Sequence, residues 1–207
     1  MLRIGVLASG GGTNLQAVID AIENEGLPAQ IVTVLSNNKS AFALERARKH
    51  HIPDTWLPRK KFTVPGAYEA ALIAHFNGVK ADLILTAGFM VILDESFTQA
   101  FPNRIMNIHP SLIPSFCGKS YYGLRVHEAV LAAGVKVTGA TVHFATEEAD
   151  AGPIIIQKAV AVHDDDTPEA LQKRVMEQAE WVILPEAVRL FASGRLTVSG
   201  NRVLVSD

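Results

Sequence analysis

The sequence predicts an α/β fold: a mostly parallel, twisted sheet with helices on both faces, followed by an antiparallel C-terminal part. As far as residue 110, short apolar runs alternate with amphipathic segments of helical length. This alternation is typical of a parallel sheet covered on both faces. Beyond that point the alternation stops. Two long apolar runs follow each other there with only residues 146–152 between them, which predicts a pair of antiparallel strands.

In the first half, each apolar run ends in a polar or glycine-rich stop. Residues 2–8 are the first expected strand, and a helix follows because Leu15, Val18, Ile19 and Ile22 recur at helical spacing. The other strands of this half are expected at residues 31–35, 54–57, 82–86 and 104–108. The other helices are expected at residues 40–50, 67–77 and 93–100.

The second half opens with a loop over residues 114–123 that is rich in Gly, Ser and aromatic residues. A helix is expected at residues 126–133, strands at 137–145 and 153–162, and a terminal hairpin at 196–198 and 202–205. Thr167 and Pro168 have the residue types preferred at the N-cap and the first position of a helix. That helix is expected to run to about residue 192, with a bend near Pro185. Because no linker divides the chain, we expect a single domain over residues 1–207.

Composition excludes several classes of protein. The net charge of −2 lacks the basic excess of most nucleic-acid binders, so no nucleic-acid partner is expected, although a small phosphorylated ligand stays open. Cys117 is the only cysteine, so no intrachain disulfide can form, which fits a reducing compartment. We find neither a signal-peptide pattern nor an apolar run of transmembrane length. A cytoplasmic location without a membrane partner is therefore expected.

The first candidate site is the turn that follows the first strand. Gly10, Gly11 and Gly12 let the backbone approach an anion closely, and the next helix offers N–H groups and the positive end of its dipole. Thr13 and Asn14 can add side-chain hydrogen bonds. This pattern predicts phosphate binding, and the alternative is a tight turn without a ligand.

Two nucleotide classes are disfavoured for this turn. A dinucleotide site usually has an acidic residue after the second strand, whereas this chain has Ser36-Asn37-Asn38 there. The sequence also lacks the Gly-Lys-Ser/Thr of an ATP-binding P-loop. The turn therefore indicates a phosphate without showing which molecule carries it.

The second candidate site is Asn107-Ile108-His109-Pro110. Residues two apart in a strand point to the same side, so Asn107 and His109 share a face. Pro110 ends the strand and places His109 at its carboxyl end, where open parallel sheets bind ligands. An amide beside an imidazole can polarise a carbonyl and move a proton, although a histidine at a strand end is often structural.

Other polar residues have weaker patterns. Asp150 lies in an acidic loop before Gly152-Pro153, where it is either solvated or close enough to a histidine to raise its pKa and orient its ring. Cys117 lacks a recognisable activating base, and His143 on an apolar strand is interpreted as a core histidine. Acids after His163 are explained by the dipole of the following helix, so no metal site is expected.

Four motifs together resemble the phosphoribosylglycinamide formyltransferase family, the folate-dependent transformylases of purine synthesis. They are Ser-Gly-Gly-Gly-Thr-Asn-Leu, Ala-Gly-Phe-Met, Asn-Ile-His-Pro-Ser-Leu and Asp-Ala-Gly-Pro, in that order over nearly the whole chain. The resemblance implies a Rossmann-like sheet, with a nucleotide phosphate part over about residues 1–100 and a folate and catalytic part over about 101–207. It implies two small-molecule substrates, glycinamide ribonucleotide and the co-substrate 10-formyltetrahydrofolate, and no metal.

The resemblance also implies roles for individual residues. Gly12, Thr13 and Asn14 match the segment that holds the ribonucleotide phosphate, and Glu180 matches a glutamate that contacts the same substrate. The match to the folate-binding segment covers Met90, Val91, Ile92 and Leu93, together with Asn107. The catalytic trio corresponds to Asn107, His109 and Asp150, with Asp150 keeping His109 cationic so that His109 and the Asn107 amide stabilise an oxyanion.

The chain departs from the family pattern at three places. Val91 and Pro65 stand where many relatives have arginine, and Arg59, Lys60 or Lys61 could supply the second missing charge. The segment from Ser115 to Gly123 also differs, and it is either a mobile lid or a variable surface loop.

Three alternatives remain for the function. Methionyl-tRNA formyltransferase would need a further C-terminal domain and a basic surface, and formyltetrahydrofolate hydrolase usually has an additional N-terminal domain. A nucleotide- or folate-binding sensor would bind its ligand without turnover. The sequence leaves the oligomeric state open between monomer and homodimer.

Overall fold

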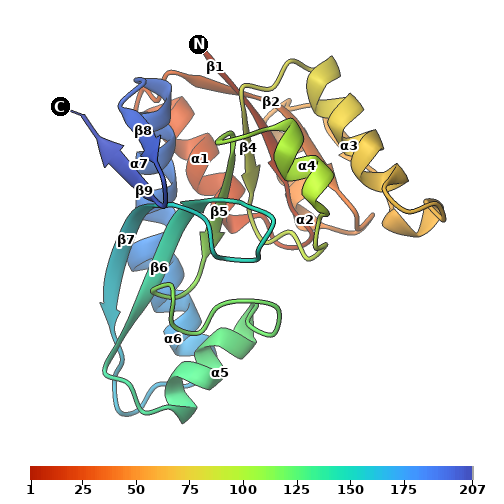
Figure 1. The fold of residues 1–207 in the computed structure, drawn as a ribbon. Helices are drawn as coiled ribbons and strands as arrows, with labels where there is room; N and C mark the ends of the chain where they lie inside the picture. Colours follow the sequence, from red (N-terminus) through yellow and green to blue (C-terminus); the bar gives the residue numbers. More distant parts are fainter. Residues whose placement is uncertain (207) are drawn as a thin grey trace. The chain divides into compact units, whose positions relative to one another are not determined.

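A computed structural model of the protein describes residues 1–206. The chain forms two compact units, Met1–Met106 and Asn107–Asp207, and the division falls inside strand β5 (Ile105–His109) (Figure 1). Among the described residues, no helix is both long and apolar enough to cross a membrane. The expectation of a single domain stays a prediction.

The first unit is built on a parallel sheet. Its further elements are β1 (Leu2–Leu7), α1 (Thr13–Asn24), β2 (Ala29–Ser36), α2 (Phe42–Lys49), β3 (Asp54–Trp56), the 3₁₀ turn η1 (Arg59–Lys61), α3 (Ala67–Gly78), β4 (Leu83–Thr86) and α4 (Glu95–Ala100). Its strands lie in the order β3-β2-β1-β4, and all of the pairs in this order are parallel.

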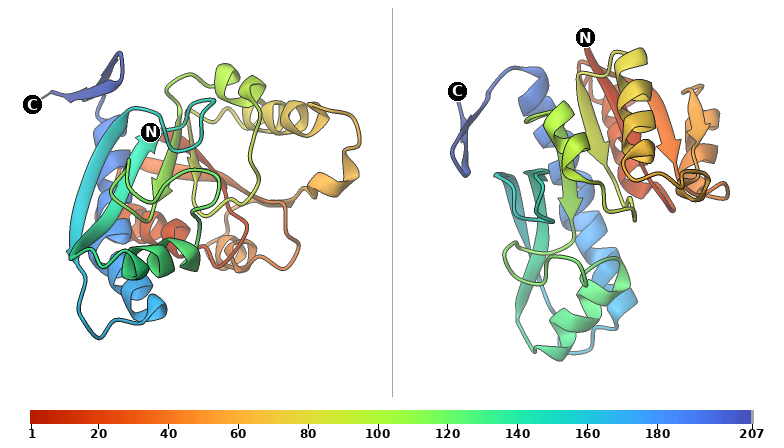
Figure 2. Two further views of the ribbon diagram at one scale, coloured as in Figure 1. Left: turned by 60° about the horizontal axis from the view of Figure 1, so that its bottom comes forward. Right: turned by 45° about the vertical axis from the view of Figure 1, so that its right-hand side comes forward.

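This strand order places helices on both faces of the first unit's sheet. Connections between parallel strands are right-handed, so the reversal of direction between β3 and β4 moves α3 to the face opposite α1 and α2. Accordingly α1 contacts α2 and α3 contacts α4, and the two pairs lie on opposite sides of the strands (Figure 2, left). The order reverses between β1 and β4, and ligands of open α/β sheets bind at the carboxyl ends of such strands.

Aromatic packing joins α3 and α4. The ring of Phe76 makes edge-on contacts with Phe97 and Phe101, and all three side chains are fully buried. Gly5 on β1 is required beneath them because a Cβ there would collide with the Phe76 ring. This packing fixes the sheet whose carboxyl edge carries the glycine-rich turn.

The second unit is dominated by antiparallel strands. Its further elements are α5 (Leu124–Ala132), β6 (Val137–Phe144), β7 (Ile154–Ala161), α6 (Pro168–Val175), the π-helical turn η2 (Met176–Glu180), α7 (Trp181–Ala192), β8 (Leu196–Ser199) and β9 (Arg202–Val205). The pairs β6–β7 and β8–β9 are antiparallel, and Ile154 of β7 pairs with Arg202 of β9 in parallel.

The predicted fold class is confirmed: the alternating half forms a parallel sheet, and the C-terminal part is antiparallel. The prediction of one helix from residue 168 to 192 is wrong in one respect. The helix is interrupted by the π turn at Met176–Glu180, ahead of Pro185. Pro185 has no N–H for the carbonyl of Trp181, so the hydrogen-bond ladder is already weakened where the π turn ends.

Candidate functional site

The second unit brings the three residues of the predicted catalytic trio together. Strand β5 points Asn107 and His109 to one side, and the loop after β6 supplies Asp150. The Asn107 Nδ2 atom donates to Asp150 Oδ1 at 3.3 Å, and His109 Nδ1 lies 3.5 Å from Asp150 Oδ2. His109 is 4% exposed, so this is a largely dry cluster. The catalytic role of the trio stays a prediction.

The orientation of the His109 ring is set by a backbone carbonyl. Its Nε2 lies 2.9 Å from the carbonyl oxygen of Phe116, which can only accept, so Nε2 carries a proton. In the neutral ring the lone pair is then on Nδ1, which faces Asp150. Nδ1 is therefore the nitrogen available for chemistry.

His143 is a fourth member of the cluster. Its Nδ1 donates to the carbonyl of Phe144 at 3.0 Å, which leaves Nε2 to accept from Asn107 Nδ2 at 3.1 Å. The same Nε2 lies 3.6 Å from Asp150 Oδ1. The interpretation of His143 as a buried core histidine holds for its burial, at 1% exposed, but misses that it orients the Asn107 amide.

Burial and charge act in opposite directions on the two titratable members of the trio. Burial lowers the pKa of His109 and outweighs the negative charge of Asp150 and the Phe116 carbonyl, which raise it. For Asp150, burial raises the pKa, but the nearby His143 and His109 rings and the Gly118 N–H together bring it below its ordinary value. In the unliganded site, desolvation of the ring therefore affects the His109 pKa more strongly than the Asp150 charge does. The expectation that Asp150 keeps His109 cationic stays a prediction.

The loop that carries Asp150 has a left-handed residue at Asp150 and no space for a side chain at Gly152. Asp150 has a φ of 57°, in the left-handed region that Asp tolerates better than most residues. Two residues on, a Cβ at Gly152 would overlap the carbonyl of Phe144, so only glycine fits. The Gly118 N–H donates to Asp150 Oδ2 at 2.9 Å and ties the carboxylate to the 115–123 segment. Together these contacts hold the carboxylate against the imidazole.

The glycine-rich turn lies in the first unit, between β1 and α1. Gly12 is the N-cap of α1 with a φ of 68°, and a Cβ there would lie 2.8 Å from the Cα and Cβ of Ala43. The carbonyl of Gly10 accepts from the Ala43 N–H at 3.1 Å, and that of Gly11 accepts from Arg46 Nε at 2.8 Å. Both carbonyls are thus engaged with α2, and the exposed backbone of Gly10 and Gly11 has no atom within 4 Å of where a Cβ would stand.

The predicted folate-binding segment adjoins this turn within the first unit. The Ser9 N–H donates to the carbonyl of Gly88 at 3.0 Å, and the Met90 N–H donates to Ser9 Oγ at 2.9 Å. Residues 90–93 have no regular secondary structure, and Met90 and Ile92 are 55% and 66% exposed. Two large apolar side chains therefore stand in solvent beside the turn predicted to bind phosphate.

Glu180 is the last residue of the π turn and is 6% exposed, which is rare for a carboxylate. Turns of this kind recur at functional sites, because the extra residue redirects side chains. The residue types of the π turn are ordinary for an α-helix, so no sequence pattern predicts it.

Among the basic residues proposed to replace a missing arginine, Arg59 already has a partner. Its Nη1 donates to Glu69 Oε1 at 3.1 Å, and the Glu69 side chain is 2% exposed. Lys61 lies over the ring of Trp56, with its Nζ 5.3 Å from the ring centroid. Arg59 and Lys61 thus both have partners, which favours the exposed Lys60 for an interaction with an anionic ligand.

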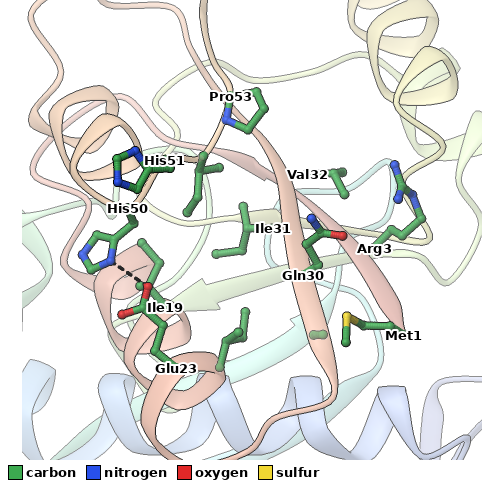
Figure 3. Close-up of a pocket in the computed structure, with 13 residues that line it drawn as sticks. Met1, Arg3, Ile19, Glu23, Gln30, Ile31, Val32, His50, His51 and Pro53 are labelled. Atoms are coloured by element: carbon green, nitrogen blue, oxygen red, sulfur yellow. Dashed lines mark hydrogen bonds and ion pairs between the residues drawn. The ribbon is translucent and has the colours of Figure 1, made fainter.

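Two further features lie outside these segments. Within residues 1–206, no group of three or more His, Cys, Asp or Glu side chains could hold a metal ion. A pocket of about 610 Å³ opens at the amino-terminal ends of β1 and β2, the edge opposite the glycine-rich turn (Figure 3). The ion pair between His50 and Glu23 lies along its wall, and none of the predicted site residues lines it.

Comparison with known proteins decides the family. The sequence model of the formyl transferase family matches residues 2–188, which is most of the chain. The chain belongs to the formyl transferase family. A phosphoribosylglycinamide formyltransferase of Haemophilus influenzae is 40% identical over 201 residues, 97% of this chain and 92% of that protein. The human trifunctional purine biosynthetic protein adenosine-3 is 40% identical over 199 residues, and the chain spans 19% of its length.

Solved structures agree with this assignment. Glycinamide ribonucleotide transformylase 1 from Symbiobacterium toebii superposes with a TM-score of 0.94 at 43% identity, over 100% of this chain and 95% of that one. A formyltetrahydrofolate deformylase from Pseudomonas syringae has a TM-score of 0.87 at 29% identity, and the chain covers 66% of it. The predicted family, its Rossmann-like fold and the predicted type of reaction, formyl transfer, are confirmed.

Proposed function

We propose that this chain transfers the formyl group of 10-formyltetrahydrofolate to the primary amine of glycinamide ribonucleotide, a step of de novo purine biosynthesis. One observation of the site supports an amine as acceptor. His109 Nδ1 and Asp150 Oδ2 face each other at 3.5 Å, and both are acceptors when His109 is neutral and Asp150 ionised. A ligand that supplies a hydrogen-bond donor would satisfy both acceptors, and the N–H of an amine is such a donor. The family membership of the chain points the same way.

In the proposed reaction, the amine nitrogen attacks the formyl carbon and the carbonyl electrons move to oxygen. The proton of the attacking amine passes to His109 Nδ1, and ionised Asp150 stabilises the resulting imidazolium. The developing oxyanion accepts a hydrogen bond from Asn107 Nδ2, whose 3.3 Å contact with Asp150 is long and readily replaced. The bond between carbon and the folate nitrogen then breaks, and that nitrogen receives the proton from His109.

The two substrates are assigned to segments by their chemistry. The Gly12-Thr13-Asn14 segment would bind the ribonucleotide phosphate, because α1 begins there and the carbonyls of Gly10 and Gly11 just before it are engaged with α2. The exposed apolar side chains of Met90 and Ile92 suit the flat ring of a folate, with Val91 and Leu93 completing that segment. Glu180 would contact the ribonucleotide. A cytoplasmic location, the absence of a metal, and the choice between monomer and homodimer stay predictions.

Offering three acceptors separates this function from its alternatives. Purified protein with 10-formyltetrahydrofolate is given glycinamide ribonucleotide, formylatable tRNA or water, and release of tetrahydrofolate is followed with each. We expect turnover that depends on glycinamide ribonucleotide and yields its formylated product. Equal release of folate without an acceptor would make the chain a hydrolase, like the deformylase it is similar to. Binding without turnover would make it a sensor.

A further inference from the structure

A hydrogen-bond network, buried at Thr141 and Ser111 and extending to the exposed Gln157, lies behind the carbonyl that orients His109. The hydroxyl of Thr141 on β6 donates to the carbonyl of Ser111 at 2.6 Å and accepts from the Ile113 N–H at 3.1 Å. Gln157 on β7 donates through Nε2 to the Thr141 hydroxyl at 3.0 Å and to the carbonyl of Ile113 at 2.9 Å. The Thr141 hydroxyl thus uses its one donor and both of its acceptor sites, and Thr141 is 0% exposed.

The same network reaches the Phe116 carbonyl through Ser111. The Ser111 hydroxyl lies 2.6 Å from the carbonyl of Ser115 and 3.3 Å from that of Phe116. Ser111 is also 0% exposed. Its backbone carbonyl accepts the hydrogen bond from the Thr141 hydroxyl, which therefore helps to fix the position of Ser111. Phe116 has a φ of 50°, which an aromatic residue adopts only when its surroundings impose it.

We propose that Thr141 and Gln157 are positioning residues, which hold the 111–116 segment so that the Phe116 carbonyl fixes the His109 proton on Nε2 and leaves Nδ1 as the reactive nitrogen. Neither side chain touches the reacting atoms. They act through Ser111 and Phe116. Their importance for turnover rests on the proposed function, whereas their effect on the imidazole tautomer is a property of the unliganded protein and does not depend on that function.

The direction of the effect follows from the chemistry of imidazole. The Phe116 carbonyl favours a proton on Nε2 of His109, and the Asp150 carboxylate favours a proton on Nδ1. When the Phe116 carbonyl is displaced, the influence of Asp150 remains. The tautomer with its proton on Nδ1 therefore gains population. In that tautomer Nδ1 is no longer an acceptor, so it cannot take the proton of the attacking amine.

Strand β6 supplies a matched control in Thr138. Thr138 is also buried, at 2% exposed, but its hydroxyl has no hydrogen-bond partner among the described residues. Thr138→Val removes a buried hydroxyl without breaking a contact, whereas Thr141→Val leaves the Ser111 carbonyl and the Ile113 N–H unsatisfied. Thr141→Ser keeps the hydroxyl and serves as the conservative rescue.

The test measures the tautomer and the kinetics of the same variants. ¹⁵N spectra of histidine-labelled protein at pH 8 report which nitrogen of His109 carries the proton. Wild type, Thr138→Val and Thr141→Ser are expected to show the proton on Nε2. Thr141→Val is expected to show a mixture, with kcat at least about 10-fold lower and the KM for glycinamide ribonucleotide within about 2-fold of wild type.

Gln157→Leu is a second test variant for the case that Thr141→Val does not fold. It removes only the two hydrogen bonds that the Gln157 amide donates from β7. It is expected to change the tautomer ratio in the same direction and to lower kcat about 3-fold or more. An unchanged tautomer in a folded Thr141→Val or Gln157→Leu protein would overturn the proposal, even if stability and activity fell. A wild-type protein with the Nε2 proton but no transfer activity would refute the proposed function alone.

Discussion

Replacing Asp150 by asparagine tests the charge that the proposed reaction requires. The carboxylate oxygen lies 3.5 Å from His109 Nδ1, and its side chain is 13% exposed. Two unit charges at that distance attract by about 1 kcal/mol in water and about 5 kcal/mol at the effective dielectric constant of about 20 that suits sites near a protein surface. Asp150→Asn keeps the shape but removes this attraction to the imidazolium, so we expect kcat to fall roughly 10- to 3,000-fold.

The pH profile gives the sign of the same effect. If neutral His109 accepts the proton, kcat/KM falls on the acid side as His109 becomes protonated in the free enzyme. The charge of Asp150 raises the pKa of His109, against the larger effect of burial, so the acid limb of Asp150→Asn should move to lower pH.

Stopped-flow measurement of folate release between pH 5 and pH 9 would determine both quantities. Glu148→Gln, which neutralises an exposed carboxylate of the same loop, is the control and should leave rate and profile unchanged. A rate within 3-fold of wild type together with an unmoved acid limb would show that Asp150 has no electrostatic role.

Three further predictions concern the scaffold. Gly12→Ala should weaken phosphate-ligand binding, measured by calorimetry, and lower the free energy of unfolding by about 1–3 kcal/mol, because φ at this position is 68° and the new Cβ would be crowded. Gly11→Ala is the control and should have neither effect, because a Cβ there has open space. The hydrogen bonds from Arg174 lower the pKa of Asp166 to about 2, so their stabilisation is present above the ordinary value of 3.8 and is lost as pH falls toward 2. Asp166→Asn should then lower the free energy of unfolding in urea by about 2 kcal/mol at pH 7 and flatten the acid loss, and an unchanged acid loss would refute this. Burial lowers the pKa of His127 to about 4, so the free energy of unfolding falls as pH drops from the ordinary value of 6.5 toward 4. His127→Leu should remove this fall. The change that it makes in the free energy of unfolding should therefore be about 2 kcal/mol more favourable at pH 5 than at pH 8.

The parallel half of the fold and the proximity of two members of the proposed catalytic trio could be predicted from the sequence by simple geometry. Asn107 and His109 share a face because a strand has a period of two, and the structure places both in one cluster. Asp150 could not be found in this way, because its approach depends on a left-handed backbone that has no marker in residue type. Only the family resemblance pointed to it.

Other parts of the site were beyond prediction for physical reasons. The group that orients His109 is the backbone carbonyl of Phe116, and a carbonyl is the same in every residue, so no pattern reveals it. The π turn before Trp181 likewise has no marker in its own residues, because Met176–Glu180 are ordinary residue types for an α-helix. His143 has the same strand parity as Thr141 on β6, and this parity could have placed both on the side of the trio, but the apolar run around them favoured a core position.

His109→Ala shows whether His109 moves the proton in formyl transfer, provided that turnover and binding are measured on the same protein. Calorimetry with glycinamide ribonucleotide measures binding at the proposed phosphate site, which lies on a different segment of the chain. We expect transfer to fall at least about 1,000-fold while the Kd of the ribonucleotide stays within about 3-fold of wild type. Transfer at more than a tenth of the wild-type rate in a folded His109→Ala protein that binds both substrates would contradict it.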